Sequence, residues 1–397
     1  MNQPLPNAIA ALAPELRDWR RTIHRHPELG YEETRTAALV AEKLRSFGVD
    51  RLETGMGGTG VVATIHGQDG PGADESEMIL LRADMDALPI QEATGLDYAS
   101  EIDGKMHACG HDGHTTMLLG AAKQLAETRN FKGSVHLVFQ PAEEGGAGAQ
   151  AMIEDGLFDN FPCRAVFGMH NWPTMPVGVF AVRSGPALAA ANQFDIRLKG
   201  RGGHAAKPDS ARDPIVAGAQ LISMAQSIIS RRLDPMQAAV LSFTTFHAGS
   251  THNVIPETAE LSGTIRCFDE AAHTEICRLL EKMVHDLADA HGMSASVRFG
   301  DKGYPPTIND PEATEIARIA AEAVVGPENM QPSHPPTMGA EDFAFLARVK
   351  PGCFVITGNG DSASLHHPEY DFNDDAAPYG VAYWVKLVET ALPRNAA

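Results

Sequence analysis

The sequence predicts an α/β fold with a second domain inserted into the first. Apolar runs typical of buried strands alternate with helical patterns from residue 79 to 184 and again after 303. Between them, over residues 185–302, the order becomes βαββαβ, the ferredoxin-like unit. The 397 residues also exceed what one hydrophobic core usually holds. We therefore expect one domain from residues 1–184 and 303–397, and an inserted domain from 185–302.

The predicted strands of the first domain end in acids or histidines. "MILLRADMD" ends in Asp84 and Asp86, "SVHLVFQPAEE" ends in Glu143 and Glu144, and "RAVFGMH" ends in His170. A further strand, "CFVITGN", is followed by "SLHHP", and helices are predicted at "TTMLLGAAKQLAE" and "DPEATEIARIAAEAVV". Because open α/β sheets bind ligands beyond the carboxyl ends of their strands, these polar side chains indicate where a site should lie.

The inserted domain has its own succession of elements. Strand "NQFDIRLKG" precedes helix "DPIVAGAQLISMAQSIISRR", in which Pro214 suits the first turn. Strands "AAVLSFTTFHA" and "AELSGTIRCF" follow, then helix "DEAAHTEICRLLEKMVHDLADAHG" and strand "SASVRFG". Residue types that bind metals occur both before and after this unit, so we interpret it as an insertion.

Composition excludes several classes of protein. The formal charge of −19 argues against nucleic-acid binding, because phosphate backbones would be repelled. We expect no membrane partner, because no apolar run approaches the ~18 residues that a membrane helix needs. The start of the chain lacks the pattern of a secretory signal. Five scattered cysteines suit reduced thiols better than a disulfide framework, so we expect a cytoplasmic protein.

The stretch "MHACGHDGHTTM", residues 106–117, concentrates metal-binding side chains. His107, Cys109 and His111 alternate, so in extended chain they would project to one side. Two divalent ions need several anionic or imidazole ligands, and such a pair could polarise an amide carbonyl and activate a water for hydrolysis. The residues that could supply the ligands are Asp84, Cys109, His111, Glu144, His170 and one of His366 or His367.

The stretch "PAEEGG" offers a general base. In extended chain the neighbouring Glu143 and Glu144 would point in different directions, so that one could bind metal while the other faces the substrate. An isolated Glu-Glu pair is usually an acidic surface turn, but this pair follows a wholly apolar strand. A carboxylate held there is suited to take a proton from water and to pass it to a leaving amine.

Several motifs in sequence order resemble the M20 family of metallopeptidases, in the amidohydrolase branch that includes hippurate hydrolase and the indole-acetyl-amino-acid hydrolases. The resemblance covers nearly the whole chain and implies a two-metal peptidase-like catalytic domain with an inserted lid and dimerisation domain. The motifs are "RRTIHRHPELGYEE", "LLRADMDALPI", "MHACGHDGHTTMLLGAA", "VFQPAEEGGAGA", "GMHNWP", "GRGGHAAKP", "NVIP" and "LHHPEYDFND". The metal ligands that it implies are Cys109, His111, Glu144, His170 and His366, with His367 as the alternative to His366 and Glu143 as the base.

The resemblance also suggests roles for residues outside this ligand set. Asp84 lies where related peptidases place a histidine ligand, so it either binds metal or orients a neighbour, with Asp86 behind the ligands. His204 in "GRGGHAAKP" and Asn253 in "THNVIP" match residues that hold the substrate's carbonyl oxygen or carboxylate, and His204 would also stabilise the oxyanion. Arg266 either pairs with a substrate carboxylate or is a solvated strand charge.

The expected function is hydrolysis of the amide of an N-acyl amino acid to a carboxylic acid and a free amino acid. It would use two divalent ions (Zn, Mn, Co or Ni) in a homodimer, or a dimer of dimers, joined through the lid. Alternatives within the family are N-acetyl-diaminopimelate deacetylation and dipeptide cleavage. A non-catalytic metal-binding protein would not need Glu143, and a redox protein using Cys109 would need a resolving cysteine nearby. For "HRHPELGYEE" we expect only helix-end packing.

Overall fold

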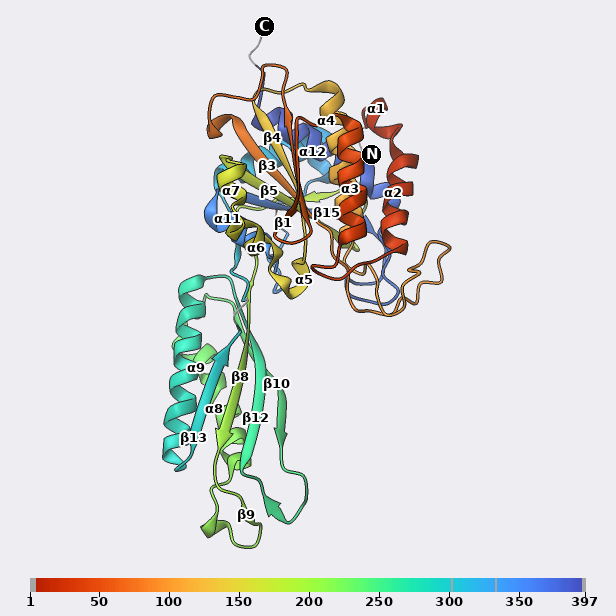
Figure 1. Ribbon diagram of the computed structural model, residues 1–397. Coiled ribbons are helices and arrows are strands. Elements are labelled where there is room, and N and C mark those ends of the chain that lie inside the picture. The colour runs from red at the N-terminus through yellow and green to blue at the C-terminus, as the bar shows by residue number, and fades with distance from the viewer. Residues whose placement is uncertain (1–4, 301–302, 333, 395–397) are drawn as a thin grey trace. The chain divides into compact units, whose positions relative to one another are not determined.

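The computed structural model describes residues 5–300, 303–332 and 334–394. Two compact units are formed (Figure 1). The first comprises Met1–Gly185, Ile308–Pro335 and Asp342–Ala397, and the second comprises Pro186–Thr307 and Pro336–Glu341. Both contain helices packed on sheets with parallel or antiparallel strands, which confirms the predicted mixed α/β fold class.

The first unit contains a seven-stranded sheet in the order β1-β2-β4-β3-β5-β15-β6. The central strands β4, β3, β5 and β15 are mutually parallel, whereas the outer strands pair antiparallel. Helices cover both faces, so the central strands are buried on both sides and read as continuous apolar runs. The strand bounds are β1 Arg51–Met56, β2 Gly60–His66, β3 Met78–Asp84, β4 Ser134–Gln140, β5 Ala165–Pro173, β6 Phe180–Ala181 and β15 Gly352–Gly360.

Long helices form one layer of this unit, and on the other side of the sheet the short helices α6 and α11 pack against β4, β5 and β15 (Figure 1). Helix α4 packs on β3 and against α2, α3 and α12. A Cβ at Gly120 would lie only 2.5 Å from Val381, so glycine allows α4 and α12 to approach closely. The helices are α1 Asn7–Ala10, α2 Ala13–Arg25, α3 Thr34–Phe47, α4 His111–Thr128, α5 Glu143–Gly146, α6 Gly148–Glu154, α7 Leu157–Asn160, α10 Pro311–Val325, α11 Phe343–Val349 and α12 Ala377–Ala391, with 3₁₀ turns η1 Glu75–Glu77, η3 Pro327–Asn329 and η4 Asp374–Ala376.

The second unit contains a four-stranded antiparallel sheet in the order β10-β12-β8-β13. Along the chain its elements follow the βαββαβ order expected from the sequence. Asp213 caps α8 by accepting the amide of Ile215 at 2.9 Å, with Pro214 at the first helical position as predicted. The elements are β8 Ala190–Lys199, α8 Pro214–Arg232, β10 Ala239–Ala248, β12 Thr258–Cys267, α9 Glu270–Ala290 and β13 Ser294–Phe299, with η2 Pro208–Ser210 and the short pair β9 Gly203–His204 with β11 Val254–Ile255. A further short pair, β7 Gly185–Leu188 with β14 Thr307–Asn309, has residues of both units.

Two general expectations can be compared with the structure. All five cysteines are free thiols, and only Cys277 is not fully buried. Among the helices described, none has the length and apolar character to cross a membrane.

Candidate active site

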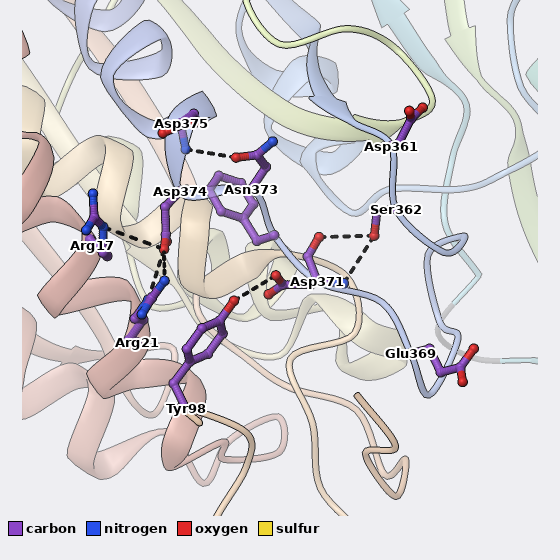
Figure 2. Close-up of a pocket in the computed structure, with 11 residues that line it drawn as sticks. Arg17, Arg21, Tyr98, Asp361, Ser362, Glu369, Asp371, Asn373, Asp374 and Asp375 are labelled. Atoms are coloured by element: carbon purple, nitrogen blue, oxygen red, sulfur yellow. Dashed lines mark hydrogen bonds and ion pairs between the residues drawn. The ribbon is translucent and has the colours of Figure 1, made fainter. Parts of the chain in front are cut away.

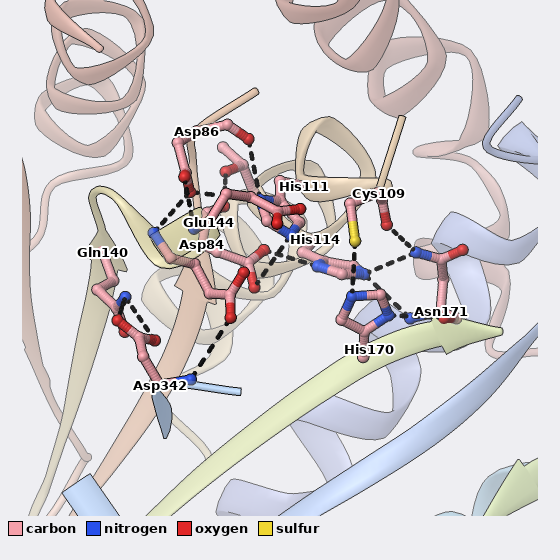
Figure 3. A network of polar contacts seen from close by, with 12 residues as sticks. Asp84, Asp86, Cys109, His111, His114, Gln140, Glu144, His170, Asn171 and Asp342 are labelled. Atoms are coloured by element: carbon pink, nitrogen blue, oxygen red, sulfur yellow. Dashed lines mark hydrogen bonds and ion pairs between the residues drawn. The ribbon is translucent and has the colours of Figure 1, made fainter. Parts of the chain in front are cut away.

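The candidate ligands meet at the carboxyl edge of the central parallel strands (Figure 3). Asp84 is the last residue of β3, and His170 lies near the end of β5. His111 opens helix α4, and Glu144 lies in the short helix α5 just after β4. Because parallel strands end at the same edge, segments distant in sequence bring their polar side chains to one place.

The "HACGH" segment bends sharply instead of staying extended. Gly110 has a φ of 90°, and helix α4 begins at the next residue. A Cβ at Gly110 would lie 2.2 Å from the side-chain nitrogen of Asn171, so only glycine fits. Cys109 then faces His170, with Sγ 3.3 Å from Nε2. His107 does not join them: its ring packs near that of His24, so the expectation from strict alternation was wrong for this residue.

Two ligand groups overlap at one cysteine. Cys109, His111 and His170 form one group, and Cys109, Glu144 and His366 form another, with the donor atoms of each group within 4.8 Å of one another. The two groups contain all five ligands implied by the family resemblance. Two groups that share one sulfur and each have two further donors could hold two neighbouring metal ions.

The two candidate histidines of the "LHHP" motif, His366 and His367, have different partners. His366 has a φ of 64°, and its amide donates to the carbonyl of Ala108 at 2.8 Å, which ties its loop to the cysteine segment. Its Nε2 lies 3.2 Å from Oε1 of Glu144. His367 instead accepts the amide of Glu369 through Nδ1 at 3.1 Å. The structure thus brings His366, not His367, to the ligand groups.

Hydrogen bonds fix which ring nitrogen of each histidine faces the ligand groups. Nδ1 of His111 donates to the carbonyl of Asp86 at 2.9 Å, and Nδ1 of His170 donates to the carbonyl of Asn171 at 2.7 Å. A carbonyl only accepts, so Nδ1 carries the proton in the neutral form of each ring, and Nε2 then has the lone pair available to a metal. Among the described atoms, Nε2 of His111 is buried without a hydrogen-bond partner. A buried, unsatisfied nitrogen aimed at a thiol and carboxylates fits a metal ion.

The charges of the cluster favour the same interpretation. Burial raises the pKa of Cys109 well above its ordinary value, and the neighbouring Glu144 raises it further. Burial opposes protonation of His111, but Asp84 and Asp86 offset this effect and raise its pKa to about 10. Anionic groups therefore outnumber cations here, and Cys109 needs a nearby cation to ionise. A divalent ion supplies that charge, and the thiolate, imidazole and carboxylate donors suit it.

Asp84 has both carboxylate oxygens engaged. Oδ1 accepts from Nδ1 of His114 at 2.6 Å, and Oδ2 accepts from Arg82 at 2.7 Å. Nε2 of His114 in turn accepts the amide of Asn171 at 3.0 Å. The His114 ring stacks edge-on to His170 with ring centres 4.5 Å apart. Both oxygens of Asp84 thus already have protein partners, as expected of an orienting residue, while the donor atoms of Asp84, His111 and His114 also lie within 4.8 Å of one another, as expected of metal ligands.

The side chain of Asp86 holds the backbone of Glu143 and Glu144. Oδ1 accepts the amide of Glu143 and Oδ2 accepts the amide of Glu144, both at 2.9 Å. The pair is not extended as expected: it opens a helical turn after Ala142, whose φ is 51°. The two side chains nevertheless diverge, because Glu144 faces His366 while Oε1 of Glu143 lies 3.4 Å from the amide of Asp342.

A second set of buried charges lies beneath the start of α4. Nδ1 of His24 is 2.8 Å from Oδ2 of Asp112, and Nη1 of Arg20 is 3.7 Å from the same oxygen. Arg20 also contacts Asp374 at 2.7 Å, in the wall of a polar pocket beside α2 (Figure 2). The expectation of helix-end packing for "HRHPELGYEE" missed these contacts. The sequence pattern that could have predicted them is the i, i+4 spacing of Arg20 and His24, which places both on the helix face that also buries Leu16.

Comparison with known proteins shows the family of this chain. The model of the family described as "Peptidase family M20/M25/M40" matches residues 80–390. This chain belongs to that family. A hippurate hydrolase of Campylobacter jejuni is 41% identical, with 96% of this chain and 97% of the relative covered. An N-acetylcysteine deacetylase of Bacillus subtilis is 38% identical, with 97% and 99% covered.

Solved structures of M20 proteins resemble this chain along its length. A Bacillus subtilis protein described as a dinuclear metal binding peptidase from the M20 family is 36% identical, with a TM-score of 0.83 and 96% and 99% of the two chains covered. An aminohydrolase from methicillin-resistant Staphylococcus aureus is 33% identical, with a TM-score of 0.88 and 96% and 98% covered. The shared fold therefore includes a protein with two metals at its site.

In the second unit of this M20 chain, two of the expected substrate-binding residues are neighbours. His204 on β9 is opposite Val254 of β11, and the amide of Ala205 donates to the carbonyl of Asn253 at 3.1 Å. Arg266 lies near the other end of β12, about 25 Å from that strand's first residue at ~3.3 Å per residue. Burial lowers the pKa of Arg266. His204 and Arg266 of one chain therefore cannot contact the same small substrate.

Proposed function

We propose that the protein is a metal-dependent amidohydrolase that cleaves N-acyl amino acids to a carboxylic acid and a free amino acid. The observation that carries the proposal is the pair of ligand groups sharing Cys109, with Glu143 beside them. Relatives over nearly the whole chain are named for hippurate and N-acetylcysteine, and a 39% identical relative from Arabidopsis thaliana is an IAA-amino acid hydrolase. All three names describe an acyl group joined to an amino acid.

Two divalent ions would be held by the five side chains of the ligand groups. Bound there, they would polarise the amide carbonyl and lower the pKa of a water. A cysteine ligand favours zinc or cobalt, whereas imidazole and carboxylate ligands also accept manganese or nickel. The ligands are Cys109, His111, Glu144, His170 and His366.

Glu143 is the proposed general base. Asp86 fixes its amide, so its carboxylate is positioned before substrate binds. It would accept a proton from the attacking water and deliver it to the leaving nitrogen, which otherwise departs as an unstable anion. His204 and Asn253 would hold the carbonyl oxygen or the substrate carboxylate, and His204 would stabilise the oxyanion. We place Arg266 at the substrate carboxylate.

Glu143→Gln tests the proposal. The glutamine side chain keeps the shape of glutamate but is not a base, so it cannot take the proton from water. Turnover of N-benzoyl, N-acetyl and indole-acetyl amino acids should therefore fall at least about a hundredfold. Metal content, measured on the same protein, should stay at the wild-type level. Glu144→Gln is the matched control and should lose metal. If Glu143→Gln loses metal and Glu144→Gln does not, the two roles are exchanged.

Peptide cleavage is a second candidate, because a thermostable carboxypeptidase of Saccharolobus solfataricus is 40% identical over 87% of this chain. Dipeptides and N-acetyl-diaminopimelate therefore belong in the same substrate panel. Faster cleavage of either than of every N-acyl amino acid would replace the leading proposal. A wild-type protein that binds metal and cleaves nothing would instead indicate a non-catalytic metal-binding protein.

We further propose that the second unit is a lid that pairs two chains, and that the enzyme works in the cytoplasm. Strand β10 is an edge strand of its sheet, with Phe246 36% exposed. On α8, Ile215, Val216 and Met224 are 40% to 48% exposed. A second copy would cover the strand edge and the apolar helix residues about a two-fold axis. The separation of His204 from Arg266 is explained if they serve the sites of different chains.

Mixing two inactive variants tests this sharing. Glu143→Gln and His204→Ala are refolded together and the mixed dimer is isolated by two affinity tags. If His204 acts in the partner's site, one site of the mixed dimer has both residues, and a substantial part of wild-type activity returns. No recovery in a verified mixed dimer would place His204 in its own chain's site or outside catalysis.

A further inference from the structure

Strand β5 carries an aromatic residue beyond its metal-ligand candidate. Trp172 follows His170 by two positions, so both side chains project from the same face of the strand about 6.6 Å apart. In the neighbouring strand, Ile356 is opposite His170 in parallel register and continues this face. Phe354 lies next along it, with its ring centre 6.4 Å from that of His170. Phe354 and Ile356 are buried and Trp172 is partly exposed, so the environment beside His170 is apolar and partly aromatic.

This surface is separate from the main hydrophobic core. Met175, Ala181 and Ile356 form a small buried cluster of their own, and Trp172 and Val179 pack against it while remaining partly exposed. A cluster of this size adds little to the stability of a sheet whose core lies elsewhere. The indole of Trp172 is only partly buried and lies beside the candidate ligand His170, so it can contact a molecule bound there.

A second aromatic ring stands against the indole. The His334 ring meets Trp172 edge-on, with ring centres 6.0 Å apart and planes at 83°. Arg183 donates to the carbonyl of His334 at 2.7 Å, and Nδ1 of His334 bonds to the carbonyl of Pro335 at 2.9 Å. These bonds hold the ring in place, so Trp172 and His334 form a preformed aromatic corner.

We propose that Trp172 and His334 form the acyl-group subsite and select substrates with an aromatic acyl group. This inference rests on the proposed amide hydrolysis. When the substrate's carbonyl carbon lies at the ligand groups, its acyl substituent begins one bond away. A benzoyl or indole-acetyl ring then extends along the strand from His170 towards Trp172. The candidates for holding the polar amino-acid end, His204, Asn253 and Arg266, all belong to the second unit. The apolar end is therefore the part that matches the aromatic corner.

The test compares two substrates that differ only in the acyl group. For Trp172→Leu, kcat/KM for N-benzoylglycine should fall about tenfold or more, mostly through KM, while N-acetylglycine should change by less than about twofold. Trp172→Phe should recover most of the loss, and His334→Ala should reproduce part of it. Trp19→Leu is the control, because this tryptophan is 6% exposed on α2 and packs on Phe47. It should not change the ratio between the two substrates.

A binding measurement gives a readout that does not depend on turnover. Trp19 and Trp384 are 6% and 1% exposed, so Trp172 should dominate any change in tryptophan fluorescence caused by a ligand. Benzoate should quench the metal-loaded wild type, glycine should not, and Trp172→Phe should abolish the response. The subsite is refuted if Trp172→Leu slows both substrates equally, or if glycine and not benzoate quenches. Wild type that cleaves neither substrate would refute the proposed function itself.

Discussion

His24 should stabilise the fold in a pH-dependent manner. Burial is the largest effect and opposes its protonation, but the hydrogen bond and charge of Asp112 and the hydrogen bond to Glu92 together outweigh it and raise the pKa of His24 from 6.5 to about 9. A folded pKa above the unfolded value means that the stabilisation is complete below pH 6.5 and is lost as the pH rises through 9. At 1.36 kcal/mol per pH unit, the interval from 6.5 to 9 corresponds to about 3 kcal/mol. Asp112 stays ionised throughout, because the same contact lowers its pKa.

His24→Gln removes the titration but keeps a side-chain donor. The assay is urea unfolding of wild type and variant at pH 5.5, 7.5 and 9.5. The difference in free energy of unfolding should fall by about 3 kcal/mol across this range and by about 2 kcal/mol between pH 7.5 and 9.5. His136→Gln is the control: burial lowers the pKa of His136 to about 4, so its difference should be constant from pH 7.5 to 9.5. A difference for His24 that does not change with pH refutes the ion pair.

Two further changes address the metal cluster. Asp86→Asn keeps the volume of the side chain but can accept a hydrogen bond from only one of the two amides of Glu143 and Glu144. Metal affinity should therefore fall about 10–100-fold, and turnover should fall with it. An unchanged affinity for zinc or manganese in metal titrations would exclude the positioning role. Cys109→Ser should lower metal occupancy and activity together, because a hydroxyl is a much poorer ligand than a thiolate. Full metal and full activity in that variant would exclude Cys109 as a ligand.

Local sequence indicates where the site lies because several of its polar residues come at the end of strongly apolar segments. The runs before Asp84, Glu143 and His170 could be identified as buried strands, and parallel strands end at a common edge. The βαββαβ order of the second unit could be predicted for the same reason: its strands alternate and its helices are long. The choice of His366 over His367 depended on resemblance, because nothing in "LHHP" distinguishes two adjacent imidazoles until the backbone turns at His366.

The contacts made by the residues behind the ligands could not be predicted from local sequence, because the partners are far apart in the chain. Arg82 joins Asp84 to Asp342, which lies 260 positions away from Arg82. In the sequence, His114 cannot be distinguished from a metal-binding histidine; the structure shows that its Nε2 accepts a hydrogen bond from the amide of Asn171. The bend at Gly110 likewise depends on space beside Asn171, which no local pattern reveals.

The distribution of buried cations separates the orienting acids from the ligand acids. Arg82 neutralises Asp84, and Arg20 with His24 neutralises Asp112, so these carboxylates keep their charge at little cost in a buried place. Within the described part of the chain, Glu144 has only a histidine as its ionic partner, and that histidine is itself a ligand candidate. Burying a carboxylate next to a thiol that must ionise costs free energy unless a cation binds beside them. Asp84 and Asp112 thus each have a buried cation of the protein beside them, whereas the ligand groups gain such a charge only when divalent ions bind, so loss of a ligand should release metal before it unfolds the protein.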